Sequence, residues 1–465
     1  MSQRKWTPLF IILLLLASFI TPVFVAGYSS IHRAEEAWSA ADYKTASLEY
    51  AQAAKILPWR RDLLEKAGIA FARANDFSTA ILYLKNTDTL SEDGWVWLGT
   101  AYYQTGDLPS TITACLEGLK NFDSVRLYQL LAFSYRGQKD WEHELSALEN
   151  QTRLDPNDAY AHYRLGLLLT LYSPGQALSV LKHASSLNPE LDSAVQTLST
   201  ALAVSDQQTR PAESLLIIGR TFGLLQDWEL AQMAFERAVE VEEKNAEAWA
   251  WLGEAKQQLG QDGRVELDKA LRFDHTSANV RALRGLYWSR QKKYPQMLSE
   301  YLLAAEFEPE NPRWQAGIGE AYSKLGELVS ALEAYQRAVD LAPDQPDSWR
   351  LLAIFCAENG VHVEDIGLPA AQQAVTLSPN DPLMLDALGF TYLSSGRYAL
   401  AEQTLMQAID LLPNNFSAHI HLAMTYLAQG NRTSAYNSLT YVRDSDISGL
   451  YAGDAIQLLE RYFPQ

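Results

Sequence analysis

The chain has 465 residues, 48% apolar and 20% charged, so it holds enough apolar material for a continuous core and is not of the disordered class. Lys and Arg number 38 against 56 Asp and Glu, a net charge of −18. This balance argues against a nucleic-acid-binding protein, because phosphate contacts need a basic face. The two cysteines, Cys115 and Cys356, are too few for a disulfide scaffold or a C-x-x-C metal site.

The first predicted element is an apolar segment at the amino terminus. Residues 9–26 form an almost unbroken apolar run without a charge. As a helix this run would be about 27 Å long, close to the ~30 Å hydrocarbon core of a bilayer. Arg4 and Lys5 precede it, which predicts that the start stays in the cytoplasm and that Tyr28 onward lies outside it.

Two interpretations of residues 1–26 compete. One is a signal anchor that stays in the membrane, and the other is a signal peptide removed after Gly27, with Pro22 breaking the helix before the cut. The length of the run favours the anchor, because a cleavable apolar core usually has only about 7–15 residues. We therefore predict a membrane-anchored chain whose remainder is extracytoplasmic, at the cell surface or in the periplasm, or secreted if the segment is cleaved.

From residue 27 onward the sequence repeats with a period near 34 residues. Pro309 and Pro343 are 34 residues apart, and Pro379 and Pro413 are again 34 apart. Because proline is tolerated in the first helical turn but not inside a helix, these residues mark where one helix ends and the next begins. Twelve units can be aligned on these marks, starting near residues 27, 61, 92, 125, 159, 212, 246, 278, 312, 346, 382 and 416.

The eighth position of every unit is glycine or alanine. Glycine inside a helix costs about 0.5–1 kcal/mol relative to alanine, so its recurrence needs a structural reason. We expect close contact between the two helices of a hairpin at this point. The twelve residues are Ala34, Gly68, Gly99, Ala132, Gly166, Gly219, Gly253, Gly285, Gly319, Ala353, Gly389 and Ala423.

This pattern resembles the tetratricopeptide repeat family, whose units carry W-x2-L-G-x2-Y, A-x3-F and P marks. The run from Trp95 to Tyr102, Trp-Val-Trp-Leu-Gly-Thr-Ala-Tyr, contains the first mark in full. The resemblance covers about residues 27–449. It implies an all-α fold, a right-handed superhelical solenoid of stacked helix-turn-helix hairpins, and it says little about function.

Departures from the repeat predict the domain boundaries. Residues 192–211 fit no unit and are typical of a lone helix followed by a polar linker. Two units also differ in length: the unit at 246 is two residues short around 260–267, and the unit at 346 is two residues long in the turn at 360–368. The predicted order is an anchor or signal peptide (1–26), an N-terminal array (27–191), the extra helix and linker (192–211), a C-terminal array (212–449) and a capping helix (450–465).

The sequence contains no recognisable catalytic constellation. The eight histidines are scattered over the units, and His419 and His421 are two apart on one helix, so they cannot share a metal ion. A phosphate-binding glycine loop with Gly-Lys-Ser/Thr does not occur. We therefore predict that the protein is not an enzyme and that it has no cofactor and no metal site.

The candidate site is a partner-binding groove. The family resemblance implies that first-helix positions 2, 5, 9, 12 and 13 line a concave face. Between residues 92 and 191 these positions carry an apolar and aromatic set, Tyr103, Phe133, Tyr160, Tyr163, Leu167 and Leu171. Such a surface has no structural purpose in a solenoid, which suggests a ligand, unless the side chains pack against neighbouring helices.

A second set occupies the same positions near the C-terminus, and for it we predict packing against the C-terminal helix. Its members are Phe390, Leu393, Ile420, Met424 and Leu427. The Lys and Asn residues with which some family members clamp a C-terminal carboxylate are not matched, since the unit at 382 has Asp386, Phe390 and Ser394 on that face. Binding of chaperone tails is therefore not predicted.

These observations predict a non-enzymatic scaffold displayed outside the cytoplasmic membrane. It would bind a protein or peptide segment in its groove and help to assemble an envelope complex. The alternative is a subunit of a polysaccharide synthesis or export apparatus, in which the aromatic groove residues contact glycan. The expected contacts are thus a protein partner of unknown identity and the membrane, through the N-terminal segment, but no nucleic acid.

Overall fold

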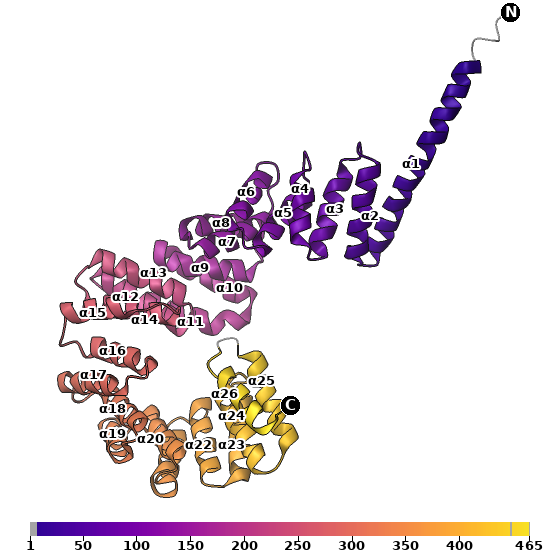
Figure 1. The fold of residues 1–465 in the computed structure, drawn as a ribbon. Coiled ribbons are helices and arrows are strands. Elements are labelled where there is room, and N and C mark those ends of the chain that lie inside the picture. Colours follow the sequence, from indigo (N-terminus) through magenta and orange to yellow (C-terminus); the bar gives the residue numbers. More distant parts are fainter. Residues whose placement is uncertain (1–6, 447–448, 465) are drawn as a thin grey trace, which may run out of the picture. The chain divides into compact units, whose positions relative to one another are not determined.

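The computed structural model describes residues 7–446 and 449–464, with side chains from residue 21 onward, and this part of the chain is helical without a strand (Figure 1). It forms two compact units, residues 1–208 and 209–465. The dividing point lies in the polar segment that follows the helix Asp192–Asp206.

The helices of the first unit are α1 (Thr7–Ser39), α2 (Tyr43–Ile56), α3 (Asp62–Arg73), α4 (Phe77–Lys85), α5 (Glu92–Gln104), α6 (Leu108–Leu119), α7 (Val125–Gln138), α8 (Trp141–Leu154), α9 (Ala159–Tyr172), α10 (Pro174–Leu187), the 3-10 turn η1 (Pro189–Leu191) and α11 (Asp192–Asp206). Those of the second unit are α12 (Pro211–Leu224), α13 (Trp228–Val241), α14 (Ala246–Gln258), α15 (Arg264–Phe273), α16 (Ala278–Arg290), α17 (Tyr294–Phe307), α18 (Pro312–Leu325), α19 (Leu328–Leu341), α20 (Pro346–Asn359), the π-helical turn η2 (Val363–Gly367), α21 (Leu368–Leu377), α22 (Pro382–Ser394), α23 (Tyr398–Leu411), α24 (Phe416–Ala428), α25 (Arg432–Ser445) and α26 (Ala452–Tyr462).

Within each unit, consecutive helices pack against one another as antiparallel hairpins, and each hairpin packs against the next. Local sequence sets the helix ends. The second helices of the first four hairpins begin after Asp42, Asp76, Asp107 and Asp140, whose carboxylates accept the backbone N–H three residues on. This architecture confirms the predicted all-α solenoid of stacked helix-turn-helix hairpins.

The small residue at the eighth position lies where the two helices of a hairpin meet. A β-carbon added to Gly219 would lie 2.4 Å from Cε1 of Phe235, and one added to Gly389 would lie 2.5 Å from Cγ of Leu405. Ala353, at the same position, is fully buried. The close contact inferred from the sequence is therefore confirmed, and it explains why no larger side chain occurs there.

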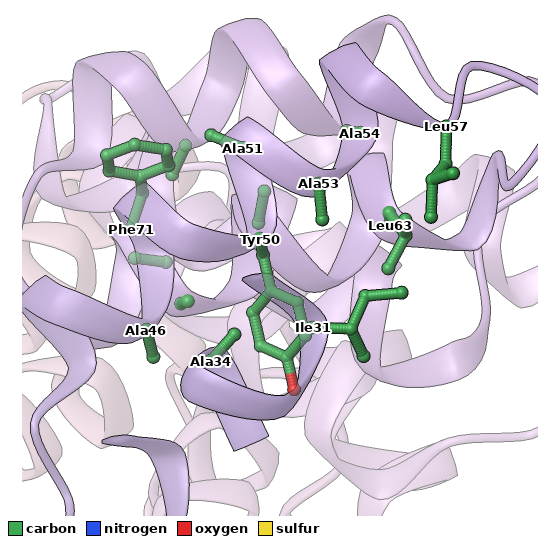
Figure 2. Packing of buried hydrophobic residues seen from close by; sticks show 14 of the residues in the cluster. Ile31, Ala34, Ala46, Tyr50, Ala51, Ala53, Ala54, Leu57, Leu63 and Phe71 are labelled. Atoms are coloured by element: carbon green, nitrogen blue, oxygen red, sulfur yellow. The ribbon is translucent and has the colours of Figure 1, made fainter. Parts of the chain in front are cut away.

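The core of the first hairpins begins at Gly27. Leu57, at the end of α2, fills the space in which a Gly27 side chain would lie. Beyond it, Ile31 and Ala34 of α1 pack with Tyr50 of α2 and with residues of α3 (Figure 2). The repeat packing therefore starts inside α1, directly after the predicted membrane segment.

Helix α1 runs from Thr7 to Ser39, and its N-terminal part projects beyond α2 (Figure 1). Pro22 lies inside this helix and does not end it, contrary to the helix break expected for a signal peptide. Most of the predicted anchor, residues 7–20, lies outside the described side chains. Within the part of the chain whose side chains the structure describes, no helix is long and apolar enough to cross a membrane.

The two units of altered length differ in their turns. In the unit at 246, α15 begins only at Arg264, and the short turn brings Gly263 against the backbone of Gly253. In the unit at 346, the longer turn contains the five-residue π-helical turn η2, which His362 precedes with a positive φ of 50°.

Candidate functional site

The structure brings Tyr103 of α5 and Phe133 of α7 together. Their ring centroids are 6.4 Å apart with an interplanar angle of 42°, and Phe133 is 46% exposed. Both helices are the first helices of neighbouring hairpins. The pair is therefore an aromatic surface that spans two hairpins and that solvent can reach.

Tyr160, at the start of α9, is the most exposed member of the predicted set, at 63%. Its hydroxyl accepts a hydrogen bond from Nδ2 of Asn188, at 3.2 Å, so the ring is held by the end of α10. Tyr163 is half-buried one turn further along α9. No ring contact that the structure describes joins Tyr160 to Phe133, so the exposed aromatics form two separate points.

Leu167 and Leu171 are buried, with only 5% and 4% of their surfaces exposed. The prediction that they line an open groove is therefore wrong. The reason is that α9 is apolar around most of its circumference from Leu165 to Leu171, as expected for a helix covered on several sides. These leucines instead pack against neighbouring helices, which is the alternative given in the sequence analysis.

The predicted packing of the second set against the C-terminal helix is confirmed for Ile420 and Met424, whereas Phe390 and Leu393 pack against residues of α22–α24 instead. Ile420 and Met424 belong to one apolar cluster with Leu459 of α26. Phe390 is buried and stacks on the imidazole of His421, with centroids 4.1 Å apart. Nδ1 of His421 in turn lies 2.7 Å from Oδ1 of Asp386. This end of the chain is therefore filled by its own side chains.

A cluster that sequence reasoning missed surrounds Arg73, at the end of α3. Its guanidinium lies 4.8 Å from the ring of Trp38, 5.3 Å from that of Tyr43 and 5.5 Å from that of Trp97. It also donates a hydrogen bond of 3.2 Å to the Tyr43 hydroxyl. The rings come from the first and third hairpins and Arg73 from the second, and a cavity of about 430 Å³ opens beside them. No spacing in the sequence indicates this convergence.

A second cavity follows from the shortness of α4. This helix has 9 residues, whereas α2 has 14 and α6 has 12. Where a longer helix would continue, a cavity of about 340 Å³ opens between α4 and α6, with Trp95 and Tyr102 in its wall. The unit at 61 also lacks the proline that follows the second helix in the units at 312 and 382, and this absence is a sign of the irregularity in the sequence.

The same first-helix positions of the C-terminal array carry paired charges. Arg290 holds Glu254 by two hydrogen bonds of 2.6 and 2.7 Å, and the Glu254 side chain is only 5% exposed. Arg220 similarly pairs with Glu247. These residues occupy first-helix positions 2, 9 and 13. A ligand on this face would have to break ion pairs that are already formed and partly desolvated.

The cysteine thiols are buried, and the imidazoles of His419 and His421 are each held by a contact with another residue. Burial raises the pKa of the Cys115 thiol to about 12 and that of Cys356 to about 11, so neither is a thiolate near neutral pH. His419 contacts the Pro413 carbonyl oxygen and His421 contacts Asp386, so the two imidazoles have different partners, as their spacing predicts. In the described part of the chain no group of three or more His, Cys, Asp or Glu side chains could hold a metal ion.

Comparison with known proteins identifies the repeats. Tetratricopeptide repeat models match residues 297–346, 318–382 and 384–415. Over 348 residues the chain is 23% identical to Superkiller protein 3 of Schizosaccharomyces pombe, and this match covers 71% of the chain but 21% of that protein. Over 214 residues it is 25% identical to aspartyl/asparaginyl beta-hydroxylase of Mus musculus, covering 41% of the chain and 27% of that protein.

Both matches thus span less than a third of the relative's length. Among solved structures, yeast Tom70 is similar at 15% identity, covering 94% of this chain and 95% of that one, with a TM-score of 0.44. The hairpins described above and the matching models agree on the repeat type. Residues 297–382 and 384–415 are therefore tetratricopeptide repeats, as the sequence pattern indicated.

Proposed function

We propose that the protein is a scaffold that binds a segment of a partner protein on the first helices of its N-terminal array. The observation that carries the proposal is the exposed aromatic surface of Phe133, in contact with Tyr103, and of Tyr160 one hairpin further on. Exposed, rigid aromatic side chains are the residues that most often dominate binding energy at protein interfaces.

The contrast between the two arrays supports the choice of the N-terminal one. On the equivalent face of the C-terminal array, Arg290 and Arg220 are already paired with carboxylates. A partner gains little by replacing such pairs, because it must supply a new partner for each buried charge. The rings of Tyr103, Phe133 and Tyr160 carry no charge that a partner would have to match, and the Arg126–Asp93 pair on the same helices is largely exposed.

Attachment to the membrane is the second part of the proposal. Residues 9–26 have the length and apolar character of a membrane-spanning helix, and Arg4 and Lys5 favour a cytoplasmic start. Helix α1 continues through residues 26–28 into the first hairpin, so a cut after Gly27 would sever a helix within its packed region. Both facts favour an uncleaved anchor, with the repeats outside the cytoplasm assembling an envelope complex.

The test is site-specific photocrosslinking in native membranes, with the crosslinker placed at position 133 or 160. The matched control positions are 82 and 116, because Leu82 and Leu116 of the second helices α4 and α6 are 60% and 46% exposed, nearly the same as Tyr160 and Phe133. We expect one defined protein adduct from 133 and 160 and none from 82 and 116.

Substitution completes the test. Phe133→Ala combined with Tyr160→Ala should abolish capture at a neighbouring position such as 103, whereas Leu82→Ala combined with Leu116→Ala should not. Equal capture in both variants would contradict the aromatic surface. Binding of envelope glycans to the purified chain, without a protein adduct, would instead support the polysaccharide apparatus, because aromatic faces also stack on sugars.

A further inference from the structure

An exposed apolar cluster lies where α1 enters the first hairpin. Val23, Phe24, Val25 and Tyr28 of α1, together with Trp59 of the loop between α2 and α3, are each between 40% and 63% exposed. Two ring contacts join the aromatic members: Phe24 lies 5.2 Å from Trp59 and 6.4 Å from Tyr28. We call these five residues the α1–Trp59 cluster.

The position of Trp59 is fixed by packing. Leu57, two residues before Trp59, is fully buried against Gly27 of α1, and the backbone N–H of Arg60 donates to the Leu57 carbonyl oxygen at 2.9 Å. Leu57 thus ties the start of the loop to α1, and the hydrogen bond between Leu57 and Arg60 closes a turn around Trp59. An exposed indole held in this way keeps its place relative to the α1 axis.

The position of the cluster along the axis of α1, relative to the predicted membrane segment, indicates which environment covers its exposed side chains. Phe24 lies two residues before the end of the predicted membrane segment at Ala26, about 3 Å along the helix axis. The ring of Trp59 is beside it. If residues 9–26 span the hydrocarbon core, Trp59 and Tyr28 lie at its outer boundary, which is the depth that Trp and Tyr side chains prefer.

We propose that the α1–Trp59 cluster is a membrane-contact surface at the outer lipid interface, where the anchor ends and Trp59 of the loop enters the lipid beside it. This inference rests on the proposed anchoring by residues 9–26. The first hairpin would then be tied to the bilayer at two points, the helix α1 and the loop carrying Trp59. Two points of attachment set the orientation of the first hairpin, which a single flexible tether cannot do.

The contact is apolar rather than electrostatic. Arg60 next to Trp59 forms two hydrogen bonds of 2.8 Å with Asp62, and this pairing raises the pKa of Arg60, with a smaller contribution from Tyr28. Arg61 pairs with Asp88. Because both cations are matched by carboxylates, they add little attraction for anionic lipid, and the surface should seat equally well on zwitterionic lipid and at high salt.

The first experiment uses the full chain reconstituted in phosphatidylcholine vesicles, with a nitroxide label on Trp59→Cys. The native thiols do not interfere, since Cys115 and Cys356 are both fully buried. The control is the same label on Leu48→Cys, which is 60% exposed on α2 of the same hairpin. We expect the label at 59 to be relaxed more by oxygen than by a water-soluble nickel complex, and the label at 48 to show the reverse.

The second measurement keeps the native residue. In a Trp6→Phe background, which removes the tryptophan directly before the anchor, brominated phosphatidylcholine should quench a fraction of the tryptophan fluorescence, and Trp59→Phe should remove most of that fraction. Trp97→Phe, a half-buried indole of the same unit, should leave it unchanged. The result should be the same at low and high salt.

Flotation separates the two hypotheses. If the chain floats with the vesicles after alkaline washing, but the label at 59 is as water-exposed as the label at 48, the anchor stands and the contact surface is refuted. If the chain does not float, the anchoring by residues 9–26 is refuted and the contact surface with it. Shielding at 59 in a floating chain supports both.

Discussion

At the scale of single residues, the fold depends on places where no side chain fits. The strongest case is Gly263, in the shortened turn of the unit at 246. A β-carbon there would lie 2.0 Å from the carbonyl oxygen of Gly253, and backbone atoms cannot rotate away as a side chain can. The two-residue deletion is therefore accommodated only because both residues are glycine.

Gly263→Ala should destabilise the C-terminal unit by about 3 kcal/mol, the upper part of the usual range for overpacking. The control is Gly453→Ala in α26, where a β-carbon meets nothing within 4 Å and alanine favours the helix. Urea unfolding followed by circular dichroism should show a lower midpoint for the first variant and an unchanged or higher one for the second. Equal midpoints would contradict the backbone clash.

Glu320, on α18, predicts a pH dependence. Burial raises its pKa above the ordinary 4.5, Lys324 opposes the shift and Glu358 adds to it. When folding raises the pKa of a carboxyl, the group does not reduce the stability of the protein at a pH below its unfolded pKa, where it is protonated in both states. As the pH rises towards and through the folded pKa, the charged form is disfavoured in the folded state and the stability falls. Glu320→Gln should therefore raise the thermal midpoint at pH 8 and leave it unchanged at pH 4. An equal rise at both pH values would show that charge is not the cause.

At the scale of elements, the hairpin turns share one backbone conformation. In eleven of the twelve units the fifteenth residue has a positive φ, and in the unit at 159 the equivalent Ser173 has a negative φ of −150°. These residues are Ala41, Asn75, Gly106, Lys139, Gln226, Gly260, Lys292, Gly326, Gly360, Gly396 and Gly430. The left-handed conformation strains the non-glycine members, because their β-carbons approach the backbone.

Neighbouring units offer a reciprocal test of this strain. Lys292 has φ 54° and Gly326 has φ 81°, and a β-carbon on Gly326 would meet nothing within 4 Å. Lys292→Gly should therefore stabilise the C-terminal unit by about 0.5 kcal/mol, and Gly326→Ala should destabilise it by about 1 kcal/mol. Thermal melts of both variants check the signs. A loss of stability in Lys292→Gly would show that the lysine side chain contributes more than the backbone strain costs.

A further recurring contact lies at the fourth position of the first helix. Nε1 of Trp349 donates to the Pro343 carbonyl at 2.8 Å, Nε1 of Trp249 donates to the Glu243 carbonyl at 2.7 Å, and Nε2 of His419 lies 2.9 Å from the Pro413 carbonyl. In each case the acceptor is six residues earlier. These polar rings therefore fasten the preceding loop to the helix, so these ring nitrogens are not free to bind a ligand.

The features that recur in every unit could be predicted from the sequence. Because the same position carries a small residue in all twelve units, the close helix contact at Gly389 and the order of the hairpins were predictable from the spacing. The candidate site was predicted in part: Phe133 and Tyr160 are exposed, whereas Leu167 is buried. The convergence of rings on Arg73 depends on how three hairpins stack, which a pattern within one unit does not contain.

At the scale of the whole molecule, a solenoid gains its stability from contacts between neighbours, so damage should remain local. Helix α26 is the last element to cover an apolar face, and Leu459 packs there with Ile420 of α24 and Leu439 of α25. Leu459 is 9% exposed, whereas Ile456 on the same helix is 41% exposed.

Leu459→Ser should therefore cost about 2–3 kcal/mol, and Ile456→Ser less than about 0.5 kcal/mol, since the second side chain already meets solvent. The informative measurement is amide hydrogen exchange along the chain. In Leu459→Ser, exchange should accelerate in α24 and α25, fade over the adjacent hairpin and stay unchanged in α2–α10. Faster exchange throughout both units would show that the chain unfolds as one cooperative block, whereas a local effect would mean that each hairpin is held chiefly by the two that flank it.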